Sequence, residues 1–108
     1  RRSGNVDMSV STSSESFESI PTEFQLLQNY PNPFNPSTQI EFAIPEASDV
    51  RLEVFNTLGQ KVRTLKDAYM PAGYYSVRFD ATSFPSGVYY YRLTAGSFIE
   101  LKNMLLIK

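Results

Sequence analysis

The sequence predicts an all-β fold, an antiparallel sandwich of about seven short strands in two sheets. Apolar and polar residues alternate in several runs, and this period of two is typical of half-buried strands. Four of the five glycines stand at breaks between those runs. No long segment has the spacing of an amphipathic helix.

The first half of the chain contains a short Leu26-Leu27 strand, a longer strand and a hairpin. Apolar side chains alternate from Thr38 to Ile44, and Pro45 ends this strand because proline cannot donate to a sheet ladder. Residues 50–54 alternate again, residues 56–59 form a turn with Gly59 free to take positive φ, and residues 61–65 return as the hairpin partner.

The second half continues the same pattern. Tyr75, Val77 and Phe79 alternate with polar residues, and Pro85-Ser86-Gly87 breaks the chain, with Gly87 expected in a positive-φ turn. Residues 88–95 form a long strand with Tyr89, Tyr91 and Leu93 on one face. Residues 98–107 form the last strand, with charged Glu100 and Lys102 opposite Ile99 and Leu101. This spacing of strands and turns favours an immunoglobulin-like arrangement.

Residues 1–21 have a different composition and are predicted to be a flexible linker before a domain at residues 22–108. Their apolar residues are sparse, although Val6, Met8 and Val10 alternate and leave a short strand open as an alternative. The chain begins at Arg1 rather than Met, so we expect a fragment of a larger protein. Seven of the first twenty residues are serines: Ser3, Ser9, Ser11, Ser13, Ser14, Ser16 and Ser19.

Composition excludes several classes of function. The formal net charge of -1 argues against binding to nucleic acid or to an anionic membrane surface, which needs clustered cations. The chain has no Cys and no His, which excludes disulfides, Cys-His and Ser-His-Asp catalysis and ordinary zinc sites. No glycine-rich phosphate loop and no bilayer-length apolar run is present. We therefore expect no cofactor, no metal and no direct membrane insertion.

Carboxylates and tyrosines leave two weaker alternatives. Asp49 and Asp67 lack the close spacing of calcium ligands, and Asp80 is expected to stabilise the turn after Phe79. Tyr89 and Tyr91 are expected in the core, with Tyr90 outside, although a row of exposed tyrosines would suit a carbohydrate-binding module. Paired carboxylates can catalyse hydrolysis, and the candidates here are Glu23, Glu41, Glu53, Asp80 and Glu100. Most of them fall on polar strand faces, so we do not expect an enzyme.

The segment Tyr30-Pro31-Asn32-Pro33-Phe34-Asn35-Pro36 is the least ordinary part of the chain. Its prolines fix φ and hold the preceding residues in extended geometry. We expect either a rigid crossover between two strands or a stiff surface ridge that a partner recognises.

At this segment the chain resembles a known family. Residues 30–38 (Tyr-Pro-Asn-Pro-Phe-Asn-Pro-Ser-Thr) are similar to the opening of the type A C-terminal sorting domain of the type IX, or Por, secretion system. The resemblance spans about residues 24–108, although Gly-Gln-Lys-Val hairpins also occur in flagellar hook-capping domains, and Asn56 stands where the family often has Asp. Further similar blocks lie at 54–62, 72–73, 79–80, 85–93, 95–98 and 102–108.

The resemblance implies a function that the residues alone do not. Such domains guide a periplasmic cargo protein to an outer-membrane translocon and its shuttle proteins. A sortase-like peptidase at the surface then usually cleaves the cargo from the domain, leaving the cargo at the cell surface or outside the cell. The signal residues implied here are Pro85, Gly87, Tyr89, Leu93, Gly96 and Lys108.

Two rivals remain from the residues, namely an immunoglobulin-like spacer or adhesion module and a carbohydrate-binding module. The absence of a tail after Lys108 favours a signal over a spacer, and the Lys108 side chain is expected to be solvated because burying an unpaired ammonium is very costly.

Overall fold

The computed structural model describes residues 20–108. All but the last two residues of the expected linker lie outside this range, as does the alternative strand at residues 6–10. No helix in the described part is long and apolar enough to cross a membrane. The strands are β2 (Gln25–Leu26), β3 (Ser37–Ile44), β4 (Ser48–Phe55), β5 (Lys61–Met70), β6 (Gly73–Asp80), β7 (Gly87–Ala95) and β8 (Phe98–Leu106).

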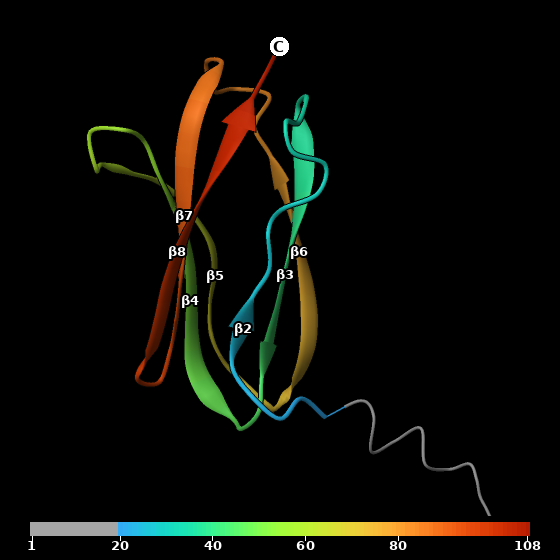
Figure 1. Cartoon of the computed structure of the whole chain (residues 1–108). Helices are drawn as coiled ribbons and strands as arrows, with labels where there is room; N and C mark the ends of the chain where they lie inside the picture. The colour runs from blue at the N-terminus through green and yellow to red at the C-terminus, as the bar shows by residue number, and fades with distance from the viewer. Residues whose placement is uncertain (1–19) are drawn as a thin grey trace, which may run out of the picture.

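These strands form two antiparallel sheets that face each other (Figure 1). The smaller sheet has the order β2-β3-β6, and the larger has the order β5-β4-β7-β8. Pro45, Pro71 and Pro85 each lie where the chain passes from one sheet to the other, at positions where no ladder hydrogen bond is required. The prediction of an all-β sandwich of about seven strands is confirmed.

The core lies between the sheets and follows the alternation in β3, β4 and β7. Ile40 and Phe42 of β3 face Leu52 and Val54 of β4, and all four are at most 2% exposed. Tyr89, Tyr91 and Leu93 of β7 are buried, as predicted. Stacked rings of Phe24 and Phe98, whose centroids lie 5.2 Å apart, pack against the edge of this core.

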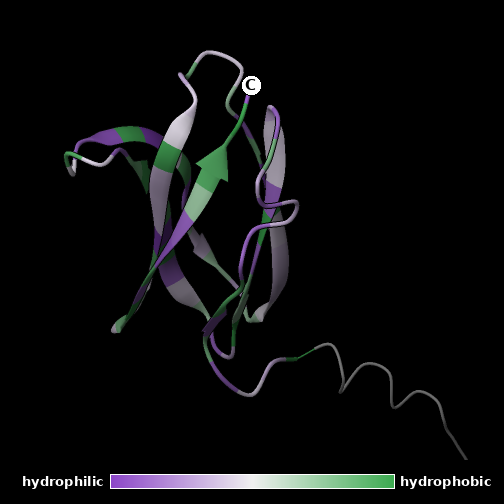
Figure 2. Ribbon diagram, turned by 45° about the horizontal axis from the view of Figure 1, so that its top comes forward, coloured by the Kyte–Doolittle hydropathy of each residue, from purple (hydrophilic) through white to green (hydrophobic). Residues whose placement is uncertain are grey.

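The two faces of β8 alternate as predicted, but the aliphatic face of its first half is the outer one. Ile99 and Leu101 are 64% and 54% exposed, whereas Glu100 and Lys102 point toward the smaller sheet and form a 3.4 Å ion pair. Figure 2 shows hydrophobic residues continuing along the end of β8. At this end only Met104 and Leu106 are buried. Because side chains alternate along a strand, burial of these two residues also turns Glu100 inward and Leu101 outward.

One strand, β5, is longer than the pattern indicated. β5 extends to Met70, five residues beyond the predicted hairpin arm, and it pairs with β4 through two register shifts. These shifts bend the hairpin away from the sandwich, and Figure 1 shows its tip projecting to one side. The Asn56–Gly59 turn at this tip has Gly59 at φ +83°, the left-handed conformation expected there.

Candidate recognition surface

Four of the six predicted signal residues lie at the end of the sandwich where β8 finishes beside the loop between β6 and β7. Asp80 Oδ1 accepts a 3.0 Å hydrogen bond from the Thr82 backbone N–H and another from the Thr82 hydroxyl, so the expected turn is present. These hydrogen bonds, and the Arg78 and Arg63 charges to a smaller extent, lower the pKa of Asp80 despite slight desolvation. Asp80 thereby fixes the first part of this loop.

Lys108 binds this loop through two groups. Its backbone N–H donates to Ser86 Oγ at 3.0 Å, and its Nζ donates to the carbonyl oxygen of Thr82. Lys108 is exposed, as expected for a solvated side chain. The expectation did not include the hydrogen bond that its ammonium donates to a protein carbonyl. The last residue is held against residues 82–86 from both its main chain and its side chain.

The second half of the loop is fixed from within β7. The Tyr89 hydroxyl donates to the Pro85 carbonyl oxygen at 2.7 Å, and the Tyr89 side chain is buried. Gly87 has φ +150°, as the expected positive-φ turn requires, and pairs with Leu106 across the ladder. Pro85, Gly87 and Tyr89 thus position the loop that contacts Lys108.

The proline segment covers the outer edge of β8 at the same end. Phe34 N–H donates to the Leu105 carbonyl at 2.9 Å, and Ile107 N–H donates to the Phe34 carbonyl at 2.9 Å. Asn32 Oδ1 accepts from the Leu105 N–H at 3.0 Å. The Phe34 ring is 1% exposed and anchors the segment in the core, while Tyr30 is 80% exposed. The segment connects β2 and β3, as the first of the two expectations stated. Recognition of its exposed residues by a partner stays a prediction.

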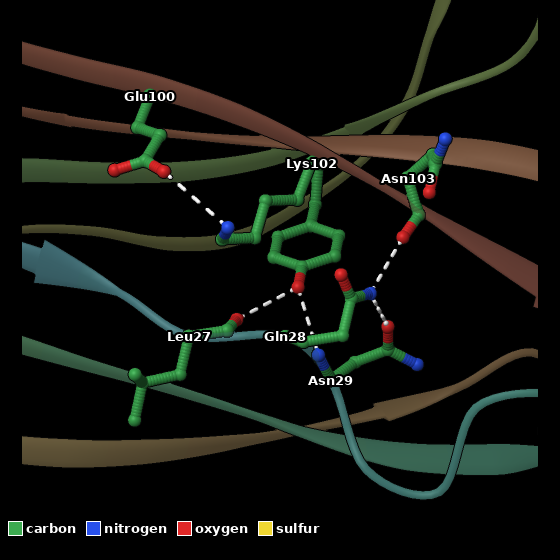
Figure 3. Close-up of polar contacts among 7 residues, drawn as sticks. Leu27, Gln28, Asn29, Glu100, Lys102 and Asn103 are labelled. Atoms are coloured by element: carbon green, nitrogen blue, oxygen red, sulfur yellow. Dashed lines mark hydrogen bonds and ion pairs between the residues drawn. The ribbon is translucent and has the colours of Figure 1, made fainter.

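A buried polar network fixes the start of the proline segment (Figure 3). The Tyr91 hydroxyl accepts from Asn29 N–H and donates to the Leu27 carbonyl, both at 2.8 Å. Asn29 Nδ2 donates to Thr38 Oγ1 at 3.0 Å and to the Pro31 carbonyl at 3.1 Å. Burial raises the pKa of Tyr91 to about 12, although the Asn29 hydrogen bond opposes this rise.

The same network reaches the exposed side of β8. Gln28 Nε2 donates to Asn29 Oδ1 at 2.7 Å and to the Asn103 carbonyl at 2.8 Å, as the labelled residues in Figure 3 show. The segment that precedes the prolines is therefore tied both to the core and to the last strand.

The six predicted signal residues do not form one surface. Pro85, Gly87, Tyr89 and Lys108 gather at one end of the sandwich. Gly96 lies in the turn between β7 and β8 at the opposite end, and Leu93 is fully buried in the core. The sequence named Asn32 and Ser86 only as members of longer motifs and did not name Thr82. The contacts by which these three residues hold the end of the chain are made only in the folded protein.

The structure also shows where the other candidate side chains lie. Tyr89 and Tyr91 are buried and present no stacking face for a sugar. Within residues 20–108, no group of three or more metal-ligating side chains gathers. Glu53 differs from the other carboxylates because it is 4% exposed and pairs with Arg92 at 3.0 Å and Lys61 at 3.5 Å.

Comparison with known proteins identifies the family. The family model of the secretion system C-terminal sorting domain matches residues 28–108, a range that begins just before the proline segment and ends at Lys108. No curated protein and no solved structure matches the chain. The matched region contains Thr82 and Ser86, which bind Lys108, and Asn32 and Phe34, which bind the proline segment to the end of β8. The chain therefore belongs to the family of secretion system C-terminal sorting domains, and it carries a sorting signal for type IX secretion.

Proposed function

We propose that residues 22–108 act as a folded sorting signal for a cargo protein attached ahead of residue 1. The type IX machinery recognises the domain, which directs the cargo to the cell surface or the extracellular space. The cargo passes through the periplasm, engages the outer-membrane translocon with its shuttle proteins, and is separated from the domain by a surface sortase-like peptidase. The observation that carries this proposal is the family match over residues 28–108.

Within this proposal the signal residues have two roles. Lys108 and Pro85 are exposed and are proposed to contact the machinery directly. Tyr89 and Leu93 are buried, so they act by holding the strand in place. Gly87 and Gly96 both have positive φ and act by shaping the turns at the two ends of β7.

The Lys108 role is tested by paired measurements on one variant. Lys108→Ala removes a hydrogen bond of an exposed side chain, so the melting temperature should change little. Export of a reporter fused ahead of residue 1 should fall, because the receptor loses a charged contact. Lys66→Ala on β5 is the control and should leave both quantities unchanged. Normal export of Lys108→Ala would remove Lys108 from the recognised residues.

Cleavage is tested on the same reporter. The serine-rich composition of residues 1–21 is typical of segments that proteases cut. We expect N-terminal sequencing of the released domain to place the cut within or just before this segment. A cut after Thr38, inside the strands, would refute the proposed processing.

A further inference from the structure

The outer face of β7 and β8 has an unusual number of exposed aliphatic side chains, where a solvated sheet face is normally polar. Ile99, Leu101 and Leu105 point outward on β8 and are 64%, 54% and 37% exposed. Ile107, just after the strand, is 48% exposed. Val88 of β7 lies directly opposite Leu105 and is 41% exposed. Asn103, which pairs with Tyr90, is the one polar position in this row. Exposed apolar side chains that gather on one face mark an interaction site more often than a scattered side chain does.

A hollow opens beside this row, between the sheet and the projecting β4-β5 turn. Its volume is about 400 Å³, within the usual range of ligand clefts. Phe55 and Tyr90 pair across β4 and β7, and Leu101 pairs with Arg92 across β7 and β8. The lining residues are Phe55, Asn56, Thr57, Gly59, Tyr90, Arg92 and Leu101.

Arg92 gives the hollow a fixed positive group. Its guanidinium carbon lies 4.7 Å from the centroid of the Phe55 ring, and its Nη2 donates to Glu53 Oε1 at 3.0 Å. Nε is buried without a partner, whereas the side chain as a whole remains 40% exposed. The exposed tip of the guanidinium therefore has N–H donors that Glu53 does not use.

The charges around Arg92 favour an anionic occupant. Lys61 also pairs with Glu53, so two cations surround one carboxylate. Burial alone would raise the pKa of Glu53, but the hydrogen bonds and charges of Arg92 and Lys61 lower it below its ordinary value. With Glu53 ionised and fully engaged, the local charge is positive, and a carboxylate in the hollow would complement it.

The shape of the surface favours a chain rather than a compact ligand. The row runs from Ile99 to Ile107, with Asn103 as its one polar position, and spans about 27 Å of extended chain at ~3.4 Å per residue. It continues from the hollow at Leu101 toward the end of β8 that holds Lys108. An extended segment could place an apolar side chain on Leu101 and a carboxylate on Arg92 while following this row.

We propose that the outer face of β7 and β8, centred on the hollow at Arg92 and Leu101, docks an extended acidic and apolar segment of a partner protein. This inference rests on the proposed sorting function, because the partner belongs to the secretion machinery. It adds a recognition surface that includes none of the six signal residues predicted from the sequence.

The first experiment measures export of a reporter fused ahead of residue 1. The double variant Ile99→Ser, Leu101→Ser removes apolar side chains that are 64% and 54% exposed. The matched control, Tyr69→Ser, Tyr74→Ser, removes side chains that are 69% and 59% exposed at other places on the domain. We expect the first variant to reduce export about tenfold, which corresponds to ~1.4 kcal/mol of lost binding, and the control to be exported normally.

The outcomes separate this inference from the proposed function. Failure of the unmodified fusion to be exported would refute the function itself. Normal export of the unmodified fusion together with normal export of Ile99→Ser, Leu101→Ser would refute the docking surface alone, as would an equal loss in the Tyr69, Tyr74 control. Melting curves of both purified variants should match the unmodified domain, which excludes misfolding as the cause.

A second experiment needs no variant and tests the chemistry of the occupant. The isotope-labelled 108-residue chain is titrated by NMR with acetyl-Leu-Glu-Leu-Glu-Leu-Glu-amide, with its glutamine counterpart and with maltohexaose. We expect shifts of Phe55, Tyr90, Arg92 and Leu101 with the acidic peptide, and binding several-fold weaker with the glutamine peptide. Shifts elsewhere, no preference for the acidic peptide, or occupation of the hollow by maltohexaose alone would overturn the proposal.

Discussion

Replacing Tyr91 with Phe tests the link between the core and the proline segment. The change keeps the fully buried ring and removes only the hydroxyl. That hydroxyl bridges Asn29 N–H and the Leu27 carbonyl, both at 2.8 Å. The backbone of residues 27–29 would lose the contacts that tie it to β7, and the rest of the sandwich would remain intact.

The magnitude follows from the two groups left without a partner. A typical hydrogen bond contributes ~1 kcal/mol net, and a buried donor without a partner costs ~1–3 kcal/mol. Asn29 is 2% exposed, so its N–H cannot turn to water. Because the Leu27 side of the bridge is only partly buried, we expect a total loss of about 2 kcal/mol. For a domain of this size that loss lowers the melting temperature by about 8–16 °C.

The assay is urea unfolding of the purified chain, with Tyr90→Phe as the control. Tyr90 is half-buried on the outer face, and no hydrogen bond of its hydroxyl is formed within residues 20–108. Tyr90→Phe should therefore change the free energy of unfolding by less than ~0.5 kcal/mol. Equal losses in the two variants, or no loss in Tyr91→Phe, would refute the role given to the Tyr91 hydroxyl.

Three further predictions concern single groups. Gly87→Val should lose ~1–3 kcal/mol of stability through backbone strain at φ +150°, since open space surrounds the new side chain; an unchanged urea midpoint would contradict this. Ionised Glu53 stabilises the fold above its ordinary pKa of 4.5, and this contribution is lost as pH falls through the lower folded pKa. Glu53→Gln should therefore weaken the fall of the free energy of unfolding with decreasing pH; the same pH dependence in both proteins would argue against this role. Neutral Tyr91 stabilises the fold below its ordinary pKa of 10.0, and this contribution is lost as pH rises through its folded pKa of about 12. Ultraviolet titration should therefore show one of the seven tyrosines ionising last, and Tyr91→Phe should lack that step. Persistence of the step in the variant would assign it to another tyrosine.

Local alternation predicted most of the fold because β3, β4 and β7 each have one consistently apolar face. Ile40 and Phe42, or Tyr89 and Tyr91, are adjacent members of such a face and are all buried. The prolines and glycines between strands predicted the connections for an equally local reason, the restriction or freedom of their backbone.

β8 shows where local alternation fails. Its first half has aliphatic residues on one parity, Ile99 and Leu101, and its second half has aliphatic residues on both. The pairing with β7 aligns Met104 with the buried Tyr89, and this alignment places Leu101 opposite Arg92 on the outer face. Register with a neighbouring strand is a tertiary property, so alternation within the first half does not tell which of its two faces is buried.

Burial of Glu53 and attachment of Lys108 were missed for a related reason. Glu53 stands between Leu52 and Val54, where a charged residue normally faces water. Its partner Arg92 is 39 positions away, and Lys108 contacts Thr82 across 26 positions. No local pattern encodes such pairs. The family resemblance implied signal residues but described none of their contacts.

The most direct test of the central claim compares one reporter in two strains of a Gram-negative bacterium that has a type IX system. The reporter is fused ahead of the chain and expressed with an active or an inactivated translocon. We expect it at the cell surface or in the medium only when both the chain and an active translocon are present. Equal amounts outside the cell in both strains, or retention inside the strain with the active translocon, would contradict the assignment of this domain as a type IX sorting signal.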